Sequence, residues 1–249
     1  MCATRATSRG PLRVGILGQG RSGLSIHARW FEQSPRKYKI VAIADLLAER
    51  RQRAEKEFGC DSYRSIDDLL GRDDLDLVVN SLPSYLHPPA TIAALSAGHN
   101  VVCEKPAAWN VAQLDKMIAA ARKAKRILAP FQQSRYRALF RKTLDVIDSG
   151  VLGRIVQVRI SANGFARRWD WQTVQEYKGG NLLNTGPHFV DWAVCLQGFK
   201  KPDGILCAMD RANTWGDAED YVKVVLKKKG APVIDLEISS CDAYPGDMI

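Results

Sequence analysis

Three glycines near the N-terminus have the spacing of a phosphate-binding turn. Gly18, Gly20 and Gly23 form a Gly-x-Gly-x-x-Gly pattern directly after an apolar run. In that setting glycine permits a tight turn, and backbone N–H groups approach a pyrophosphate at the start of a helix. Asp45 ends the next apolar run, where a carboxylate accepts hydrogen bonds from ribose hydroxyls. The pattern predicts a dinucleotide site made of Asp45 and the turn residues Gly18, Gln19, Gly20, Arg21, Ser22 and Gly23.

Asp45 also bears on which dinucleotide is bound. A carboxylate at this position repels the 2′-phosphate of NADP, so NAD is the predicted cofactor and NADP is the less favoured alternative. Arg50 and Arg51 lie in the helical segment that follows and could in principle reach such a phosphate. The alternative interpretation of the pattern is three glycines in an unrelated turn, with Asp45 as a helix cap.

Aromatic and polar residues further along have the chemistry of a sugar site. Trp169 and Trp171 stand in a loop together with Arg168. Aromatic faces stack on the C–H surface of sugar rings while neighbouring polar groups hydrogen-bond to hydroxyls. These three residues are candidates for substrate binding, and a core or interface role for the tryptophans is equally open. Weaker candidates for the same pocket follow the last strand predicted for the first domain: Gln132, Gln133 and Arg135.

The elements that must position these residues change in character near Gln133. Before it, apolar strand-like runs alternate with helical patterns, which predicts parallel strands buried on both faces of a doubly wound sheet, the Rossmann fold. The predicted strands cover residues 12–17, 39–44, 75–81, 100–104 and 126–131, and the predicted helices cover residues 22–32, 46–58, 86–97 and 111–124.

After Gln133 strands dominate. A helix over residues 138–149 is predicted to end at Gly150, because glycine suits the position that follows a helix. The remaining pattern predicts a mainly antiparallel sheet from strands at 154–161, 205–210, 221–226 and 233–239, with a helical region at 182–196 and a hairpin turn at lysines 227–229. The fold class is therefore α/β, with a Rossmann domain over 12–133 and a substrate-binding α+β domain over 134–249.

The composition is that of a soluble globular protein. The chain has 249 residues, of which 46% are hydrophobic and 25% charged. No apolar run approaches the ~20 residues of a membrane-spanning helix, so no membrane association is expected. Residues 1–12 lack the apolar stretch of a secretory signal and are interpreted as a polar tail.

Charge and cysteine content argue against nucleic-acid binding and against a metal or redox site. The net charge of +9 does not predict nucleic-acid binding, because no basic stretch is interleaved with aromatic residues as in a known binding module. The six cysteines stand far apart without a Cys-x-x-Cys pair, so neither a metal site nor a redox motif is predicted. Reduced, mostly buried thiols in a cytoplasmic protein are the simplest interpretation.

Residues 80–109 contain three short motifs: Pro-x-x-x-His at Pro83 to His87, Ala-Gly-His at 97–99, and Glu-Lys-Pro at 104–106. Together they resemble the central signature of the glucose-fructose oxidoreductase/inositol dehydrogenase/MocA (Gfo/Idh/MocA) family. The resemblance implies that Lys105 lies near the nicotinamide and the substrate hydroxyl, and that the peptide bond before Pro106 is cis. It also implies cofactor contacts from Leu82, Pro83, His87, Glu104 and Lys105.

Lys105 follows a predicted parallel strand, and the carboxyl ends of such strands are where ligands bind in these folds. Its ammonium would stabilise alkoxide character as the hydroxyl proton of a substrate leaves. The alternative is a surface lysine paired with Glu104.

Residues 179–192 resemble the second motif of the same family, with an aspartate and a histidine beside the substrate. Here His188 and Asp191 match the motif, whereas Asn184 stands where the first aspartate is expected. The spacing of these three residues places them on one face of a helix, although Pro187 makes the local geometry less regular. The resemblance implies that His188 is the general base, that Asn184 orients a hydroxyl, and that Asp191 lies near the substrate. A structural histidine is the alternative.

The predicted function is NAD(P)-dependent oxidation of a secondary alcohol on a sugar, cyclitol or related polyol. Two alternatives are a redox-neutral glycoside cleavage that uses tightly held NAD, and a noncatalytic NAD-binding sensor or regulator. Members of the resembled family usually run well past 300 residues, so the second domain is expected to be incomplete at its C-terminus. Homo-oligomers that associate through the sheet of that domain are also expected, because an exposed sheet edge needs cover.

Overall fold

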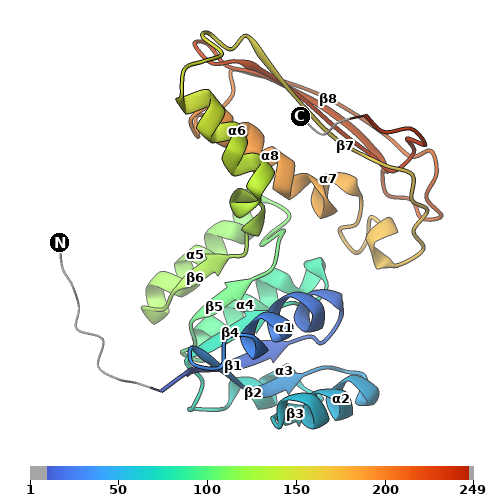
Figure 1. Cartoon of the computed structure of the whole chain (residues 1–249). Coiled ribbons are helices and arrows are strands. Elements are labelled where there is room, and N and C mark those ends of the chain that lie inside the picture. Colours follow the sequence, from blue (N-terminus) through green and yellow to red (C-terminus); the bar gives the residue numbers. More distant parts are fainter. Residues whose placement is uncertain (1–9, 247–249) are drawn as a thin grey trace, which may run out of the picture. The chain divides into compact units, whose positions relative to one another are not determined.

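The computed structural model describes residues 10–246, so Cys2 and most of the polar tail fall outside it. The chain forms two compact units that divide between Phe131 and Gln132. Each unit has its own sheet (Figure 1).

The first unit is a Rossmann fold, as predicted. Six parallel strands lie in the order β3-β2-β1-β4-β5-β6. The strands are β1 (Leu12–Leu17), β2 (Tyr38–Ala44), β3 (Asp61–Tyr63), β4 (Leu77–Asn80), β5 (Val101–Cys103) and β6 (Leu128–Pro130). The helices are the π-helix η1 (Ser22–Ala28), α1 (Arg29–Glu32), α2 (Ala48–Phe58), α3 (Ile66–Leu70), the 3-10 helix η2 (Ser84–Leu86), α4 (His87–Ser96) and α5 (Val111–Ala124).

Both faces of this sheet are buried because its central strands are apolar at nearly every position. Successive side chains of a strand point to opposite faces, so Leu17 and Val78 join one core with Met117 of α5. Ile16 and Val79 point the other way and pack in a second core with Phe31 of α1. The continuous apolar runs that predicted a parallel sheet are therefore explained by two helical layers (Figure 1).

The second unit is a four-stranded mixed sheet with helices packed on it, ordered β7-β10-β9-β8. Its strands are β7 (Gln157–Asn163), β8 (Gly204–Asp210), β9 (Tyr221–Lys227) and β10 (Val233–Ser239). Its helices are η3 (Gln133–Tyr136), α6 (Ala138–Asp148), η4 (Trp171–Thr173), α7 (Asn181–Asn184) and α8 (Gly186–Leu196). Two of the three strand pairings are antiparallel and β10 pairs in parallel with β7, which confirms a mainly antiparallel sheet.

Alternation along β9 and β10 gives this sheet one buried face. Leu236 and Val222 are buried in a core that includes Trp192 of α8 and Phe140 of α6, whose rings stack with centroids 4.5 Å apart. On the opposite face Lys223 lies between the carboxylates of Asp235 and Glu237. The core therefore fixes α8, the helix that begins just before His188.

Several local expectations are corrected. The helix predicted at residues 22–32 begins as a π-helix, and the region 182–196 is two helices that meet at Thr185. The expectation of mostly buried thiols is wrong for the described cysteines: only Cys60 and Cys103 are buried, and Cys207 is exposed.

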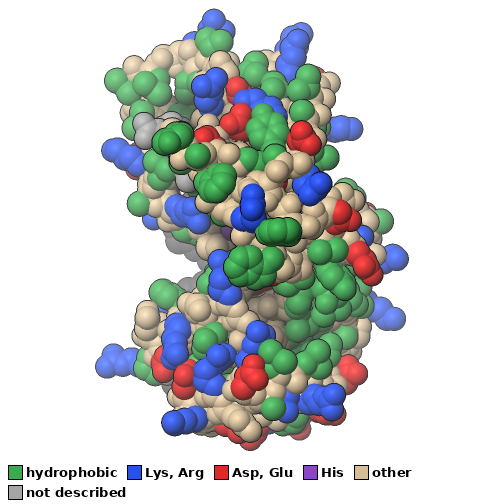
Figure 2. All heavy atoms as spheres, turned by 90° about the vertical axis from the view of Figure 1, so that its right-hand side faces the viewer, with side chains coloured by type: hydrophobic (Ala, Val, Ile, Leu, Met, Phe, Trp, Pro, Cys, Tyr) green, Lys and Arg blue, Asp and Glu red, His purple; other side chains and the backbone are tan. Residues whose placement is uncertain are grey.

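Charged side chains of both signs are scattered over the face that Figure 2 shows. Lys and Arg side chains are spread over that face, with Asp and Glu among them and apolar side chains between. Among residues 10–246, no helix has the length and apolar character needed to cross a membrane.

Candidate functional site

The glycine turn follows β1, and its packing requires glycine at two of its three positions. Gly18 has φ +86°, and a Cβ there would lie 3.0 Å from the backbone oxygen of Ser81. A Cβ on Gly23 would lie 1.9 Å from the carbonyl oxygen of Gly18, which no side chain tolerates. These two glycines close the turn against the end of β4.

Gly20 differs from these two glycines, because the space where its side chain would project is nearly empty in the described part of the protein. The one described atom within 4 Å of a Cβ built there is Nη1 of Arg50, at 3.6 Å. The fold itself therefore has room for a larger residue at position 20. Glycine at this position keeps the turn open to the pyrophosphate of a dinucleotide, so the turn fits the predicted cofactor. Beside it Arg21 is exposed and Ser22 is half-buried.

Asp45 lies just after β2 and holds the glycine turn in place. Its Oδ2 accepts a 2.7 Å hydrogen bond from the backbone N–H of Gln19, and its Oδ1 accepts one of 2.9 Å from Leu47. Arg50 approaches the same Oδ2 at 3.4 Å. Asp45 therefore orders the chain before α2 without capping it, since the N-cap of α2 is Leu47 and has no side-chain cap hydrogen bond, and it also borders a cavity.

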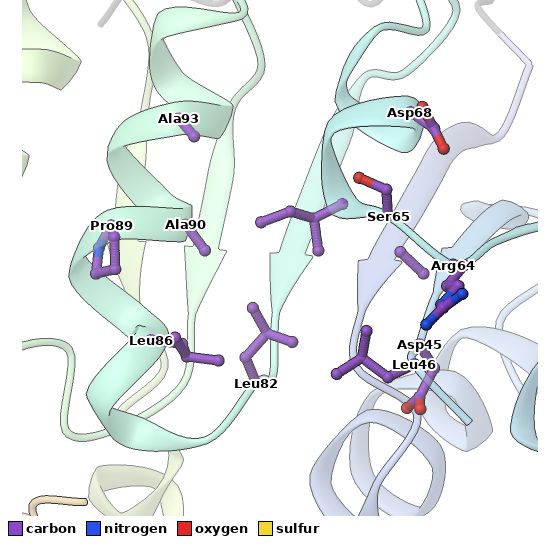
Figure 3. Close-up of a pocket in the computed structure, with 12 residues that line it drawn as sticks. Asp45, Leu46, Arg64, Ser65, Asp68, Leu82, Leu86, Pro89, Ala90 and Ala93 are labelled. Carbon is purple, nitrogen blue, oxygen red and sulfur yellow. The ribbon is translucent and has the colours of Figure 1, made fainter.

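That cavity has the size and lining of a small-molecule site (Figure 3). Its volume is about 710 Å³, within the usual range for ligand pockets. Asp45, Leu46 and Arg64 lie on one side, and Leu82 with residues of α4 on the other (Figure 3). A largely apolar cleft beside a carboxylate suits the adenosine half of NAD, whose base is flat and whose ribose carries hydroxyls.

His87 joins the segments that follow β4 and β5, and Pro83 precedes it. Nδ1 of His87 lies 2.7 Å from the carbonyl oxygen of Pro106 and its Nε2 lies 2.8 Å from that of Leu82. Burial lowers the pKa of His87. Pro83 starts the 3-10 turn that leads into α4. Both ring nitrogens of His87 therefore face backbone carbonyls and hold the segments after β4 and β5 together, whereas its contact with the cofactor stays a prediction.

Glu104 and Lys105 follow β5, and the peptide bond from Lys105 to Pro106 is cis. Oε1 of Glu104 lies 3.0 Å from Nε2 of the buried His27, and its Oε2 accepts from the backbone N–H of Lys105 at 3.1 Å. Burial alone would raise the pKa of Glu104, but the hydrogen bonds from His27 and Lys105 outweigh it and lower that pKa. Glu104 is thus an internal anchor, and it fixes the backbone from which the partly exposed Lys105 side chain extends.

In the second unit, Gln132 connects the first residues of the unit to α8. Nδ1 of His188 lies 3.0 Å from Oε1 of Gln132, whose Nε2 donates a 2.6 Å hydrogen bond to the carbonyl oxygen of Pro187. His188 itself is 8% exposed. Asp191, one turn further along α8, accepts two hydrogen bonds of 2.7 and 2.6 Å from Arg135. These bonds raise the pKa of Arg135 and hold Asp191 as an ion-pair partner.

Asn184 stands at the end of α7 in a reciprocal pair with Gln172. Gln172 donates to Oδ1 of Asn184 at 3.1 Å, and Asn184 donates back to Oε1 of Gln172 at 3.2 Å. An aspartate could only accept in such a pair, so Gln172 matches the asparagine that replaces the family's aspartate. Both side chains line a small polar cleft that also contains Arg168 and Glu219.

The structure brings together only some of the predicted substrate residues. Arg168 and Asn184 share the polar cleft, whereas Trp169 is 82% exposed and does not line it. Trp171 begins η4, which Asp170 caps. Oε1 of Gln133 is buried and has no hydrogen-bond partner among the described residues. The exposure of Trp169 excludes a core role for that tryptophan within its own unit.

Sequence reasoning missed the roles of His27 and Gln172. Each acts through a partner that is distant in the chain, Glu104 and Asn184 respectively, and no spacing rule connects them. Among residues 10–246, no group of three or more His, Cys, Asp or Glu side chains is placed to hold a metal ion.

Comparison with known families covers both units. The model of the oxidoreductase family with an NAD-binding Rossmann fold, GFO_IDH_MocA, matches residues 12–132. The model of the GFO/IDH/MocA C-terminal domain matches residues 140–248. The chain belongs to the Gfo/Idh/MocA oxidoreductase family. NAD is accordingly the cofactor of its Rossmann unit.

Relatives within the Gfo/Idh/MocA family include two named dehydrogenases. Inositol 2-dehydrogenase of Salmonella typhimurium is 31% identical over 170 residues, which are 67% of this chain and 48% of the relative. D-glucoside 3-dehydrogenase of Escherichia coli is 30% identical over 201 residues, which are 78% of this chain and 56% of the relative. The chain therefore spans about half the length of these curated relatives.

A solved structure of the family is similar over most of the chain. The WlbA dehydrogenase from Bordetella pertussis, in complex with NADH and UDP-GlcNAcA, superposes with a TM-score of 0.86 at 26% sequence identity. The match covers 94% of this chain and 74% of that structure. The NADH bound in that structure supports the interpretation of the glycine turn in this chain as a dinucleotide site.

The two glycines of contrasting packing give a direct test of the cofactor site. We expect Gly20→Ala to leave the melting temperature of the free protein unchanged while weakening NAD binding at least tenfold, about 1.4 kcal/mol. Gly23→Ala should lower the melting temperature itself, because its Cβ would overlap the Gly18 carbonyl. Thermal unfolding and calorimetric titration with NAD measure both effects. Unchanged NAD affinity in Gly20→Ala would place the pyrophosphate elsewhere.

Proposed function

We propose that the protein is an NAD(P)-dependent dehydrogenase acting on a secondary alcohol of a sugar, a cyclitol or a related polyol. The observation that carries this proposal is the fixed backbone of Lys105 at the carboxyl end of β5 in the NAD-binding unit. Two relatives named as dehydrogenases of inositol and of a D-glucoside support the substrate class.

The chemistry divides between the cofactor and the chain. NAD, when bound, supplies the acceptor for the hydride that leaves the alcohol carbon. In the proposal, neutral His188 takes the hydroxyl proton on a ring nitrogen, and the Lys105 ammonium stabilises the negative charge that develops on the oxygen. One hydride and one proton leave the alcohol, which becomes a ketone.

Residues of the polar cleft would recognise the remaining hydroxyls. Asn184 has no titratable group, so its proposed role is to orient a hydroxyl through its amide. The two hydrogen bonds with Gln172 hold that amide in place. Arg168 lines the same cleft and is proposed as a further contact. Trp169 and Trp171 are proposed to offer aromatic faces to the sugar ring, and Gln133 to offer its amide. Asp191 is proposed to act by holding Arg135.

Incubation of the purified protein with NAD and a panel of polyols, cyclitols and glycosides tests this proposal. Steady release of NADH, followed by absorbance, supports a dehydrogenase. A product formed without net NADH would instead indicate redox-neutral cleavage, and NAD binding without any product would indicate a sensor or regulator.

The proposal includes a preference for NAD over NADP of at least tenfold, about 1.4 kcal/mol, because Asp45 opposes the additional phosphate. Calorimetric titration of both cofactors into the protein measures the ratio, and Asp45→Asn should reduce it by removing the negative charge. Arg50, which lies 3.4 Å from the Asp45 carboxylate, would act in the opposite direction if it pairs with the 2′-phosphate of NADP. Equal affinities, or a preference for NADP, would contradict the role assigned to Asp45.

Assembly and location are also part of the proposal. Strand β8 is exposed along its whole length, and it presents Ile205, Leu206 and Met209 with exposed fractions of 66%, 61% and 54%. We propose that copies of the chain associate through this part of the sheet. Light scattering tests this by measuring the mass of the protein in solution.

We also propose a cytoplasmic location, which would keep the described cysteines reduced. Fractionation of cells that express the protein tests this location.

A further inference from the structure

Gln132 contacts two consecutive residues of α8 through its two amide atoms. Its Nε2 lies 2.6 Å from the carbonyl oxygen of Pro187, and its Oε1 lies 3.0 Å from Nδ1 of His188. The hydroxyl of Ser134 donates to the same Oε1 at 3.3 Å. The Gln132 amide therefore bridges the backbone before His188 and the imidazole ring itself.

These contacts determine which way the amide points. A backbone carbonyl oxygen can only accept, so the NH₂ group of Gln132 must face Pro187. The opposite orientation would place two oxygens 2.6 Å apart at Pro187 and would turn the NH₂ group toward the Ser134 hydroxyl and the ring nitrogen. The orientation with Oε1 toward His188 satisfies all three partners at once.

The amide orientation in turn determines the tautomer of the histidine. An amide oxygen has no proton to give, so the hydrogen bond at Nδ1 requires that Nδ1 carries the proton. In a neutral imidazole the lone pair then lies on Nε2. Free histidine in water favours the opposite tautomer, so the protein must supply this preference.

We propose that Gln132 is a positioning residue that holds His188 in the Nδ1–H tautomer and so makes Nε2 the basic nitrogen. The catalytic consequence rests on the proposed role of His188 as general base, whereas the tautomer itself does not. Gln132 supplies a neutral acceptor where many enzymes use a carboxylate. Asp191, three residues further along α8, is paired with Arg135.

The tautomer is measured directly by ¹⁵N NMR of histidine-labelled protein, without any turnover. The chain has four histidines, and the signals of His188 are those absent from a His188→Asn sample. Spectra are taken above about pH 8, where an ordinary imidazole is neutral. We expect protonated Nδ1 and unprotonated Nε2 in the wild-type protein.

Three substitutions separate positioning from packing. Gln132→Met keeps the length of the side chain but removes the acceptor, so the His188 signals should move toward the Nε2–H form. Gln132→Glu loses the donor to the Pro187 carbonyl but keeps an acceptor oxygen for Nδ1, so it should retain the Nδ1–H form. Gln157→Met makes the same change at an exposed residue of β7 and should leave the spectrum unchanged. Circular dichroism and thermal unfolding verify that each variant is folded.

If the protein turns over a polyol, kinetics give a second measurement. Gln132→Met should lower kcat about tenfold or more with little change in KM, because the fraction of correctly protonated base falls. Gln132→Glu should recover much of that loss and move the acidic limb of the rate profile to higher pH, since a carboxylate favours the protonated ring. An Nε2–H wild-type histidine, or a Gln132→Met protein with an unaltered tautomer, would overturn the proposal even if the dehydrogenase assignment holds.

Discussion

His188→Asn is expected to lower kcat by about 10² to 10⁴ while NAD affinity stays within a few-fold of the wild type. The proposed base lies on α8 of the second unit, and the glycine turn and Asp45 lie in the first. Removal of the imidazole should therefore affect proton transfer and leave the cofactor contacts intact. Steady-state rates with the active polyol, and calorimetric titration with NAD, measure the two quantities separately.

The pH profile distinguishes a base from a residue that only supports the fold. A protonated imidazole cannot accept a proton, so the wild-type rate should rise with pH as His188 becomes neutral and then level off. This limb should be absent in His188→Asn. The buried His87 lies in the other unit and is unchanged in the variant, so the difference between the two profiles reports on His188 and not on His87. If His188→Asn keeps both the rate and the limb, another group is the base.

The extent to which the sequence predicted the fold depended on periodicity. The strands β1, β2 and β4 are apolar at nearly every position because each has a helical layer on both sides, and such runs are visible without a structure. Strand β3 and helix α3 were missed. β3 has three residues, Asp61 to Tyr63, at the edge of the sheet, and α3 has five. Neither is long enough to complete a period.

The candidate site was predictable where a motif is contiguous and unpredictable where it depends on distant pairing. The glycine turn was recognisable because its constraints are local, as the overlap between a Cβ on Gly23 and the carbonyl of Gly18 shows. The pair of His27 with Glu104 joins residues 77 positions apart, and the pair of Gln132 with His188 joins residues 56 positions apart. Such contacts are set by how strands and helices pack, and one sequence carries no spacing signal for them.

Substitution of Lys105 by methionine keeps the length of the side chain and removes its charge. We expect Lys105→Met to lower kcat by about 10² or more, because the ammonium acts on negative charge that is greatest in the transition state. NAD affinity should change only a few-fold.

Lys105→Arg serves as the matched control for charge in that experiment. It keeps a cation at the same backbone position, which Glu104 fixes through the Lys105 N–H, and it should restore part of the lost rate. The structural alternative, a lysine that only neutralises Glu104, makes a different prediction. Glu104 already receives hydrogen bonds from His27 and from the Lys105 backbone, which a methionine at position 105 retains, so that alternative predicts an active and stable Lys105→Met protein. A folded Lys105→Met enzyme with the wild-type kcat would therefore remove the lysine from the chemical step and leave it a surface residue.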